Sequence, residues 1–100
     1  MTFRIERTAK AGSDLLAIWL AIALDDQTTA DRHLRRLEQA IAALADFPRT
    51  GPARDDIRPG IRTILRAPYH IFYSVDDESR AVRIVRIVDG RRDLQALFQR

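Results

Sequence analysis

The apolar residues of this 100-residue chain recur at helical intervals in its first half and at strand intervals in its second. Residues 2–7 alternate polar and apolar side chains, which is typical of a short strand with one buried face. A helix is predicted next, and either Thr8 or Ser13 can cap it. Its apolar stripe has the spacing i, i+3, i+4, i+7 and consists of Leu15, Ile18, Trp19 and Ile22.

A second helix is predicted from Thr28 to about Asp46, after a polar turn at residues 25–27. Thr28 and Asp31 have the spacing of a capping box. The apolar positions of this helix recur at intervals of four and three residues, which suits an antiparallel neighbouring helix; they are Ala30, Leu34, Leu37, Ile41 and Leu44. A loop follows, because residues 47–60 contain three prolines, two glycines and no periodic pattern.

The last forty residues predict an antiparallel meander. Its strands are Ile61–Arg66, Tyr69–Val75 and Ala81–Val88, joined by short turns. Asp93 can cap a final turn of helix that runs through Phe98. The order β-α-α-β-β-β predicts one α+β domain spanning all 100 residues, with a helical hairpin packed on a small antiparallel sheet.

Basic charge is concentrated in the second half of the chain. The first 57 residues carry eight basic and nine acidic side chains, whereas the remaining 43 carry nine and five, and the net charge is +3. This imbalance indicates an acidic partner, either nucleic acid or a protein rich in Asp and Glu. Lys10 is the one lysine among 17 basic residues. The excess of arginine reflects either bidentate recognition of phosphate and carboxylate or the codon usage of a GC-rich genome.

Missing residue types and motifs exclude several classes of protein. Because there are no cysteines, disulfides and thiol chemistry are excluded. Asp14 and Asp25 bracket the most apolar segment, which is too short to span a membrane, and residues 4–7 do not fit a signal peptide, so we expect a cytoplasmic protein. His33 and His70 have no metal-ligand spacing with other side chains, so no metal or cofactor is expected. No glycine-rich phosphate loop or serine nucleophile motif is present.

Two groups of residues outside the predicted core are candidates for contact with a partner. A second apolar strip on the first helix consists of Leu16, Leu20, Ala23 and Leu24. A helix that is apolar on two sides in a small domain is either deeply buried or covered by a partner, and we favour a partner. In the last strand, Arg83 and Arg86 are three positions apart, so strand alternation predicts that they point to opposite faces.

Five short stretches occur in a characteristic order: residues 14–19 (DLLAIW), 44–51 (LADFPRTG), 60–62 (GIR), 69–73 (YHIFY) and 90–94 (GRRDL). Together they extend over nearly the whole chain. In this series the chain resembles ParE-type toxins of the RelE/ParE superfamily, the toxin half of bacterial type II toxin–antitoxin modules. The resemblance implies a RelE/ParE-like fold, in agreement with the predicted order of elements.

The resemblance implies one of two activities. RelE-like members are ribosome-dependent mRNA endonucleases, whereas ParE-like members poison DNA gyrase or related topoisomerases without known catalysis. Arg66 and Arg92 match arginines that the nucleases use on the scissile phosphate, but Phe98 stands where the nucleases have a tyrosine. A phenyl ring cannot transfer a proton, and Asp89 would repel phosphate. We therefore predict a non-catalytic, ParE-like toxin that binds its target through Arg66, Arg91, Arg92 and Phe98; a RelE-like nuclease is the alternative.

The resemblance also implies a partner. In ParE-like toxins the C-terminal helix of a ParD-like antitoxin is expected to lie along the helical hairpin and the sheet edge. The implied antitoxin contacts are Leu16, Trp19, Leu20, Ala23 and Leu24. Trp19 also belongs to the first apolar stripe, and for this residue we favour a core position over a partner contact. Toxin and antitoxin would form a hetero-oligomer that reaches operator DNA only through the antitoxin and has no membrane contact.

Overall fold

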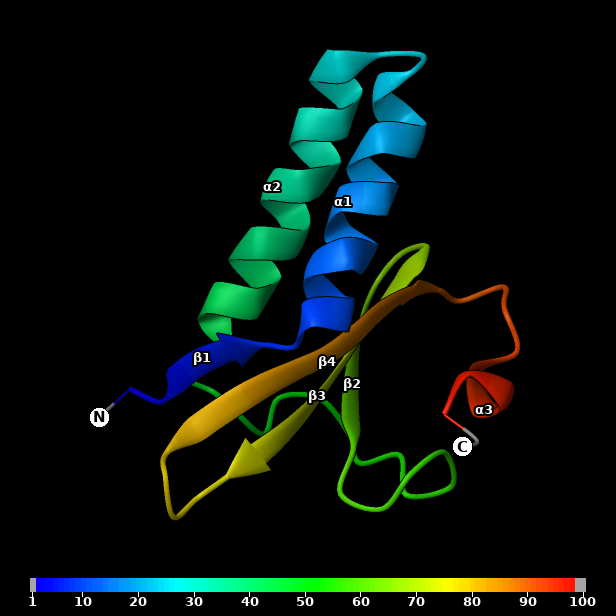
Figure 1. The fold of residues 1–100 in the computed structure, drawn as a ribbon. Helices are drawn as coiled ribbons and strands as arrows, with labels where there is room; N and C mark the ends of the chain where they lie inside the picture. The colour runs from blue at the N-terminus through cyan, green and yellow to red at the C-terminus, as the bar shows by residue number, and fades with distance from the viewer. Residues whose placement is uncertain (1, 99–100) are drawn as a thin grey trace.

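The computed structural model describes residues 2–98 and shows a helical hairpin lying over one face of a four-stranded sheet (Figure 1). A short third helix lies on the side of the sheet away from the hairpin. The elements are β1 (Arg4–Arg7), α1 (Ala9–Ala23), α2 (Gln27–Ala43), β2 (Arg62–Arg66), β3 (Tyr69–Asp76), β4 (Ala81–Asp89) and α3 (Leu94–Leu97). The predicted α+β class and the order of its elements are confirmed. No helix within residues 2–98 is long and apolar enough to cross a membrane.

Both long helices begin at side chains that accept backbone hydrogen bonds. Thr8 caps α1, since its Oγ1 accepts a hydrogen bond from the N–H of Ala11 at 3.0 Å. Asp26 caps α2, and its carboxylate accepts from the N–H groups of Thr28 at 3.0 Å and Thr29 at 3.3 Å. The prediction that Thr28 caps the second helix is therefore wrong: Thr28 already lies inside the helix and donates to the true cap.

The predicted seam of α2 faces the core. Ala30, Leu37, Ile41 and Leu44 are buried, and Leu34 is half-buried. The helix ends at Ala43, three residues before the predicted end at Asp46. These apolar side chains pack against α1 and against the sheet, so the residues that repeat at helical intervals form the interface between the two layers.

The sheet has the strand order β1-β4-β3-β2. Strands β2, β3 and β4 form the predicted antiparallel meander. Strand β1 joins it in parallel, with Arg4 beside Ala81 and Arg7 beside Ile84, so the complete sheet is mixed. Because β3 occupies one edge of β4, the first strand pairs with the other edge, which the meander leaves open.

A β-bulge in β4 changes which residues share a face. Strand β3 pairs Phe72 with Arg86 and Ser74 with Arg83, and the register shifts between Phe72 and Tyr73. Phe72 and Ser74 are two positions apart and point to the face away from the hairpin, and cross-strand partners share a face. Arg83 and Arg86 therefore point to the same face. The prediction that they point oppositely is wrong, because the bulge inserts one extra residue between them.

Each face of the sheet has its own apolar cluster. The larger one lies under the hairpin and joins α1, α2 and the sheet through the buried residues Ala11, Leu15, Leu37, Ala40, Ile41, Leu44, Ile64, Ile71, Tyr73, Val82, Ile84 and Ile87. The smaller one lies on the other face and consists of Ile61, Phe72 and Val88. Helix α3 and the loop before β2 cover the smaller cluster with Ile57, Leu94, Leu97 and Phe98.

Candidate functional site

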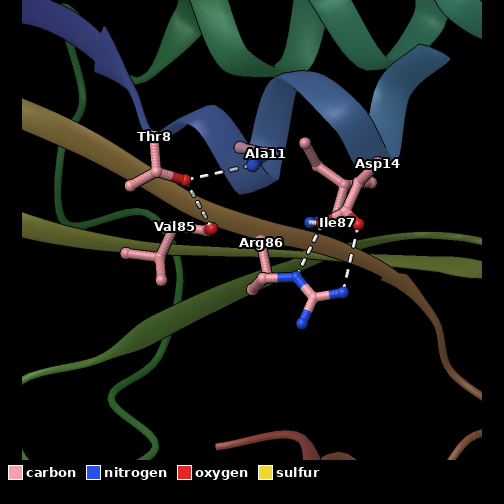
Figure 2. Close-up of polar contacts among 6 residues, drawn as sticks. All are labelled: Thr8, Ala11, Asp14, Val85, Arg86 and Ile87. Atoms are coloured by element: carbon pink, nitrogen blue, oxygen red, sulfur yellow. Dashed lines mark hydrogen bonds and ion pairs between the residues drawn. The ribbon is translucent and has the colours of Figure 1, made fainter.

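The candidate site is built around the edge of β4 that β1 leaves open. Strand β1 stops beside Ile84, and the first turn of α1 takes its place along the rest of β4 (Figure 2). The N–H of Thr8 donates to the Ile84 carbonyl at 3.0 Å, and its hydroxyl donates to the Val85 carbonyl at 2.8 Å. The same hydroxyl caps α1, so one residue fixes both the helix start and its position on the strand.

One turn later, Asp14 completes this junction. Its carboxylate accepts the Arg86 guanidinium at 2.8 Å from Nε and 3.1 Å from Nη2, and also the Ile87 backbone N–H at 3.0 Å (Figure 2). Only 16% of the Asp14 side chain and 13% of the Arg86 side chain are exposed. The Arg86 charge is therefore neutralised inside the protein. Sequence reasoning missed this pair, whose members lie 72 positions apart and share no local pattern.

Beside the junction, α1 and the end of β4 line an open hollow of about 260 Å³, here called the α1 hollow. It is lined by Asp14, Ala17, Ile18, Ala21, Tyr69, Ile87, Val88, Asp89 and Arg92. Most of these side chains are apolar, and its charged groups come from the start of α1, from the end of β4 and from the turn after it. The hollow thus joins the outer side of α1 to the predicted target-binding residues.

Three predicted target-binding residues, Arg66, Arg91 and Arg92, lie around this end of the sheet and are here called the arginine end. Arg66 is beside Tyr69 on β3, and Tyr69 is beside Asp89 on β4, so the Arg66 and Asp89 backbones are about 10 Å apart across two strand spacings. All three arginines are exposed. The structure therefore brings these residues to one end of the fold.

Some charged groups of the arginine end already have hydrogen-bond partners within the protein. Asp89 accepts the Arg91 Nε and backbone N–H, each at 2.9 Å, and these hydrogen bonds lower the pKa of the Asp89 carboxyl to about 2. Arg66 donates to the carbonyl of its neighbour Leu65 at 2.8 Å. Within residues 2–98, the Arg92 guanidinium has no hydrogen-bond or ion-pair partner. Arg92 is therefore the arginine best placed to meet an incoming anion.

Phe98 lies elsewhere. Its ring packs edge-on against Phe72 in the smaller cluster, with centroids 5.0 Å apart, and is half-buried. The guanidinium over the Phe98 ring, 5.4 Å from its centroid, belongs to Arg58. The structure thus puts Phe98 on the opposite side of the sheet from the α1 hollow. Sequence reasoning missed Arg58, because it lies in a loop with no periodic pattern.

The predicted antitoxin strip divides into two parts. Leu16, Leu20 and Leu24 are 59%, 50% and 88% exposed. Trp19 and Ala23 are half-buried, and the Trp19 indole N–H donates to Asp31 of α2 at 2.8 Å. The three leucines remain open to a partner, whereas Trp19 and Ala23 lie on the side of α1 that faces α2.

His70 lies on the face of the sheet away from the hairpin, stacked on Phe72. Burial lowers the pKa of its imidazole, and the positive charge of Arg54 lowers it further. The ring is covered by Gly90, where an added Cβ would lie 2.8 Å from His70 Cδ2. No group of three or more His, Asp or Glu side chains in residues 2–98 is arranged to hold a metal ion.

Comparison with known proteins gives a consistent result. A family model described as "ParE toxin of type II toxin-antitoxin system, parDE" matches residues 5–94. The chain is 35% identical over 94 residues to toxin ParE3 of Caulobacter vibrioides, which is 93% of this chain and 92% of that protein. It is 38% identical over 65 residues to toxin ParE1 of Mycobacterium tuberculosis, covering 65% of each chain.

Similar solved structures have the same fold. A chain of the chromosomal ParDE system from P. aeruginosa superposes with a TM-score of 0.73 at 24% identity, covering 88% of this chain and 96% of that one. A chain of the RelBE2 toxin–antitoxin complex of Mycobacterium tuberculosis gives 0.67 at 24% identity, with 89% and 99% covered. The intact E. coli RelBE complex gives 0.60 at 20% identity, with 90% and 99% covered.

Proposed function

The chain belongs to the ParE toxin family of type II toxin–antitoxin systems, and from that premise we propose that it binds and inhibits DNA gyrase or a related topoisomerase in the cytoplasm. The observation that carries the proposal is the arginine end. It presents exposed guanidinium groups at one end of the sheet, and the Arg92 guanidinium makes no hydrogen bond or ion pair within residues 2–98. Such a surface attracts an acidic region of a protein or the phosphates of bound DNA.

The proposed inhibition needs no catalysis by the toxin. Cleavage of RNA requires a group that removes the 2′-hydroxyl proton and another that protonates the leaving oxygen. Asp89 is the carboxylate beside these arginines, and with a pKa of about 2 it is too weak a base to remove a 2′-hydroxyl proton. His70 lies on the other face beneath Gly90. This arrangement supports binding rather than phosphodiester cleavage.

One observation favours the second candidate, a RelE-like endoribonuclease. Tyr69 lines the α1 hollow together with Arg92 and lies beside Arg66 in the sheet. A phenolic hydroxyl can donate a proton, so Tyr69 supplies at the arginine end the type of group that Phe98 lacks. Replacing Tyr69 with Phe would abolish RNA cleavage by such an enzyme and would leave topoisomerase inhibition intact.

We also propose a ParD-like antitoxin as the partner. The exposed leucines of α1 offer an apolar surface to an amphipathic helix. Several similar structures are themselves toxin–antitoxin complexes. In this proposal a disordered tail of the antitoxin folds onto α1, the pair forms a hetero-oligomer, and operator DNA is bound only through the antitoxin.

The test is a supercoiling assay with purified gyrase and the full-length toxin. Inhibition is expected, and Arg92→Glu should weaken it about tenfold or more, because it reverses the exposed charge. Arg83→Glu is the matched control, since Arg83 is also exposed but lies away from the arginine end, and this variant should inhibit normally. Failure to inhibit gyrase or topoisomerase IV, together with cleavage of mRNA on translating ribosomes, would contradict the proposal and favour the nuclease.

A further inference from the structure

We propose that one side of α2 binds the phosphate backbone of duplex DNA, together with Arg66 at the end of β2. This surface, here called the α2 flank, consists of Arg32, His33 and Arg36. The inference rests on the proposed function only for the source of the DNA, which is the segment that a topoisomerase holds. It adds a second contact surface, and it names DNA phosphate rather than an acidic region of a protein as the ligand.

The α2 flank lies against the turn between β2 and β3. The Arg36 guanidinium donates to the Ala67 carbonyl at 2.9 Å, and the His33 ring meets Tyr69 edge-on with centroids 6.4 Å apart. Arg66 is paired with Tyr69 across the strands, so both side chains point to the hairpin face of the sheet. Arg36 and Arg66 therefore meet at the same turn, although they come from opposite halves of the chain.

The cations of the α2 flank are not matched by acidic groups. Both acidic residues of α2 lie on its other side, where Asp31 accepts the Trp19 indole N–H and Glu38 has an ion-pair partner on β1. Arg32 and Arg36 are one helical turn apart, so their like charges repel, and neither forms an ion pair within residues 2–98. Repulsion of this kind destabilises the free helix and is relieved by a ligand that carries negative charge.

The acidic group at the start of α2 affects the two arginines unequally. The Asp26 carboxylate accepts from the backbone N–H groups of Thr28 and Thr29 and from the Thr29 hydroxyl, the last at 2.8 Å. Arg32 donates to that same hydroxyl at 3.1 Å, so one side chain separates it from the carboxylate. Arg36 lies one turn further along the helix, away from Asp26. It should therefore contribute more to anion binding than Arg32.

The surface around the α2 flank is charged rather than apolar. None of the large apolar side chains that are exposed within residues 2–98 lies on α2. They are Leu16, Leu20, Leu24, Phe47 and Leu65. Leu65 is next to Arg66 in the strand and points to the opposite face of the sheet. Protein–DNA interfaces are more polar and more positively charged than interfaces between proteins, so the α2 flank fits DNA phosphates better than a protein surface.

This contact should be weak on its own and independent of the DNA sequence. An arginine that neutralises a phosphate releases condensed counterions, so the affinity falls as salt is added. Three contacts, from Arg32, Arg36 and Arg66, predict a slope of about −3 in a plot of log affinity against log salt concentration. On a topoisomerase the contact adds to the toxin's other contacts, because both surfaces are engaged at once.

Binding is measured first on the toxin alone, by fluorescence anisotropy with a short labelled duplex at several salt concentrations. Arg36→Gln should weaken binding about threefold or more at low salt and reduce the steepness of the salt dependence by about 1, because one phosphate contact is lost. Arg35→Gln is the matched control. Arg35 is exposed on the same helix, but Asp31 and Glu38 are its neighbours at helical contact spacing, so this variant should bind within about twofold of the natural toxin.

A second measurement asks whether the contact is made on the enzyme. Binding of the toxin to purified gyrase is compared in the presence and absence of bound DNA. The natural toxin should bind the gyrase–DNA complex about threefold or more tightly than gyrase alone, because the α2 flank is engaged only in the complex. Arg36→Gln should lose this difference, and Arg35→Gln should keep it.

The outcomes separate this inference from the proposed function. The inference is overturned if Arg36→Gln binds the duplex as tightly as the natural toxin, or if bound DNA does not strengthen binding to gyrase. It is also overturned if Arg36→Gln binds gyrase alone more weakly, since the flank then meets acidic protein groups, or if single-stranded RNA competes better than duplex DNA. Inhibition of supercoiling by the natural toxin is unaffected by these results. If the toxin inhibits no topoisomerase but binds duplex DNA through Arg36, the proposed function is wrong and the DNA-binding surface is supported.

Discussion

The two faces of the sheet differ in how many buried residues pack against them. Twelve buried residues join the face under the hairpin to α1 and α2, whereas three buried residues form the cluster on the other face, under α3 (Figure 1). We therefore expect the first face to contribute most of the stability of the fold, and the second face to hold the C-terminal segment in place. The α1 hollow lies at the edge of the strongly packed face, which gives the arginine end a rigid support.

The largest effect should come from truncating a leucine on the hairpin face. Leu37 is 1% exposed, and Leu37→Ala should lower the free energy of unfolding by about 3 kcal/mol, because it leaves a cavity in the larger cluster. Leu97 is half-buried in α3, and Leu97→Ala should cost about 1 kcal/mol or less. Urea unfolding of both variants measures the difference. Equal losses would contradict the comparison of the two faces.

A smaller loss is expected at the junction of α1 with β4. Asp14→Ala should cost about 2 to 3 kcal/mol, because it strands the Arg86 guanidinium and the Ile87 N–H in a partly buried place. Adding Arg86→Met should recover much of the loss. Glu6→Ala, which removes the exposed pair with Arg4, should cost less than about 0.5 kcal/mol. A double variant no more stable than Asp14→Ala would show that the charge is not the cause.

The turn after β4 should be sensitive to the addition of one methyl group. Gly90→Ala should cost about 1 to 2 kcal/mol, since the new Cβ would lie 2.8 Å from His70 Cδ2 and must displace the ring. In a His70→Ala background the same change should cost little. A double-mutant cycle by urea unfolding gives the coupling, and additive effects would mean that the two residues do not collide.

The smallest effect should be a pH dependence of the folding stability that comes from Asp89. Its pKa is about 2 in the folded protein, against an ordinary value of 3.8, because Arg91 donates to its carboxylate. A lowered pKa stabilises the fold above about pH 4, and that contribution is lost as the pH falls from about 4 to about 2. Asp89→Asn should therefore be less stable than the natural chain at pH 7 and equal to it near pH 2. A difference that persists unchanged to pH 2 would exclude this ion pair as its source.

The fold could be predicted from local sequence patterns, because the apolar residues that recur at helical or strand intervals are the residues that the structure buries. The seam through Leu37 and Ile41 recurs at helical intervals and is buried as expected. The meander was predicted from runs such as Tyr69–Val75, and the corresponding strand β3 pairs with β2 and β4, its neighbours in the sequence. Strand β1 was expected too, but its parallel pairing with β4 was not, since nothing within Arg4–Arg7 indicates a partner some 77 residues away.

The candidate site was predictable only where it lies at the ends of predicted elements. Arg66, Arg91 and Arg92 came together because each lies near the end of a strand. The β-bulge puts Arg86 on the same face as Arg83, and Asp14 then pairs with Arg86. Both features depend on how segments far apart in the sequence are aligned. Periodicity within one segment carries no information about such pairing, so the α1 hollow could be recognised only in the folded chain.

Inhibition of a topoisomerase through the arginine end is tested most directly in living cells. The measurement follows thymidine and methionine incorporation after the toxin is induced without antitoxin, with Arg92→Glu and Arg83→Glu run in parallel. We expect that thymidine incorporation falls first, that Arg83→Glu behaves like the natural toxin, and that Arg92→Glu is largely harmless. An immediate fall in methionine incorporation with DNA synthesis intact would contradict this account.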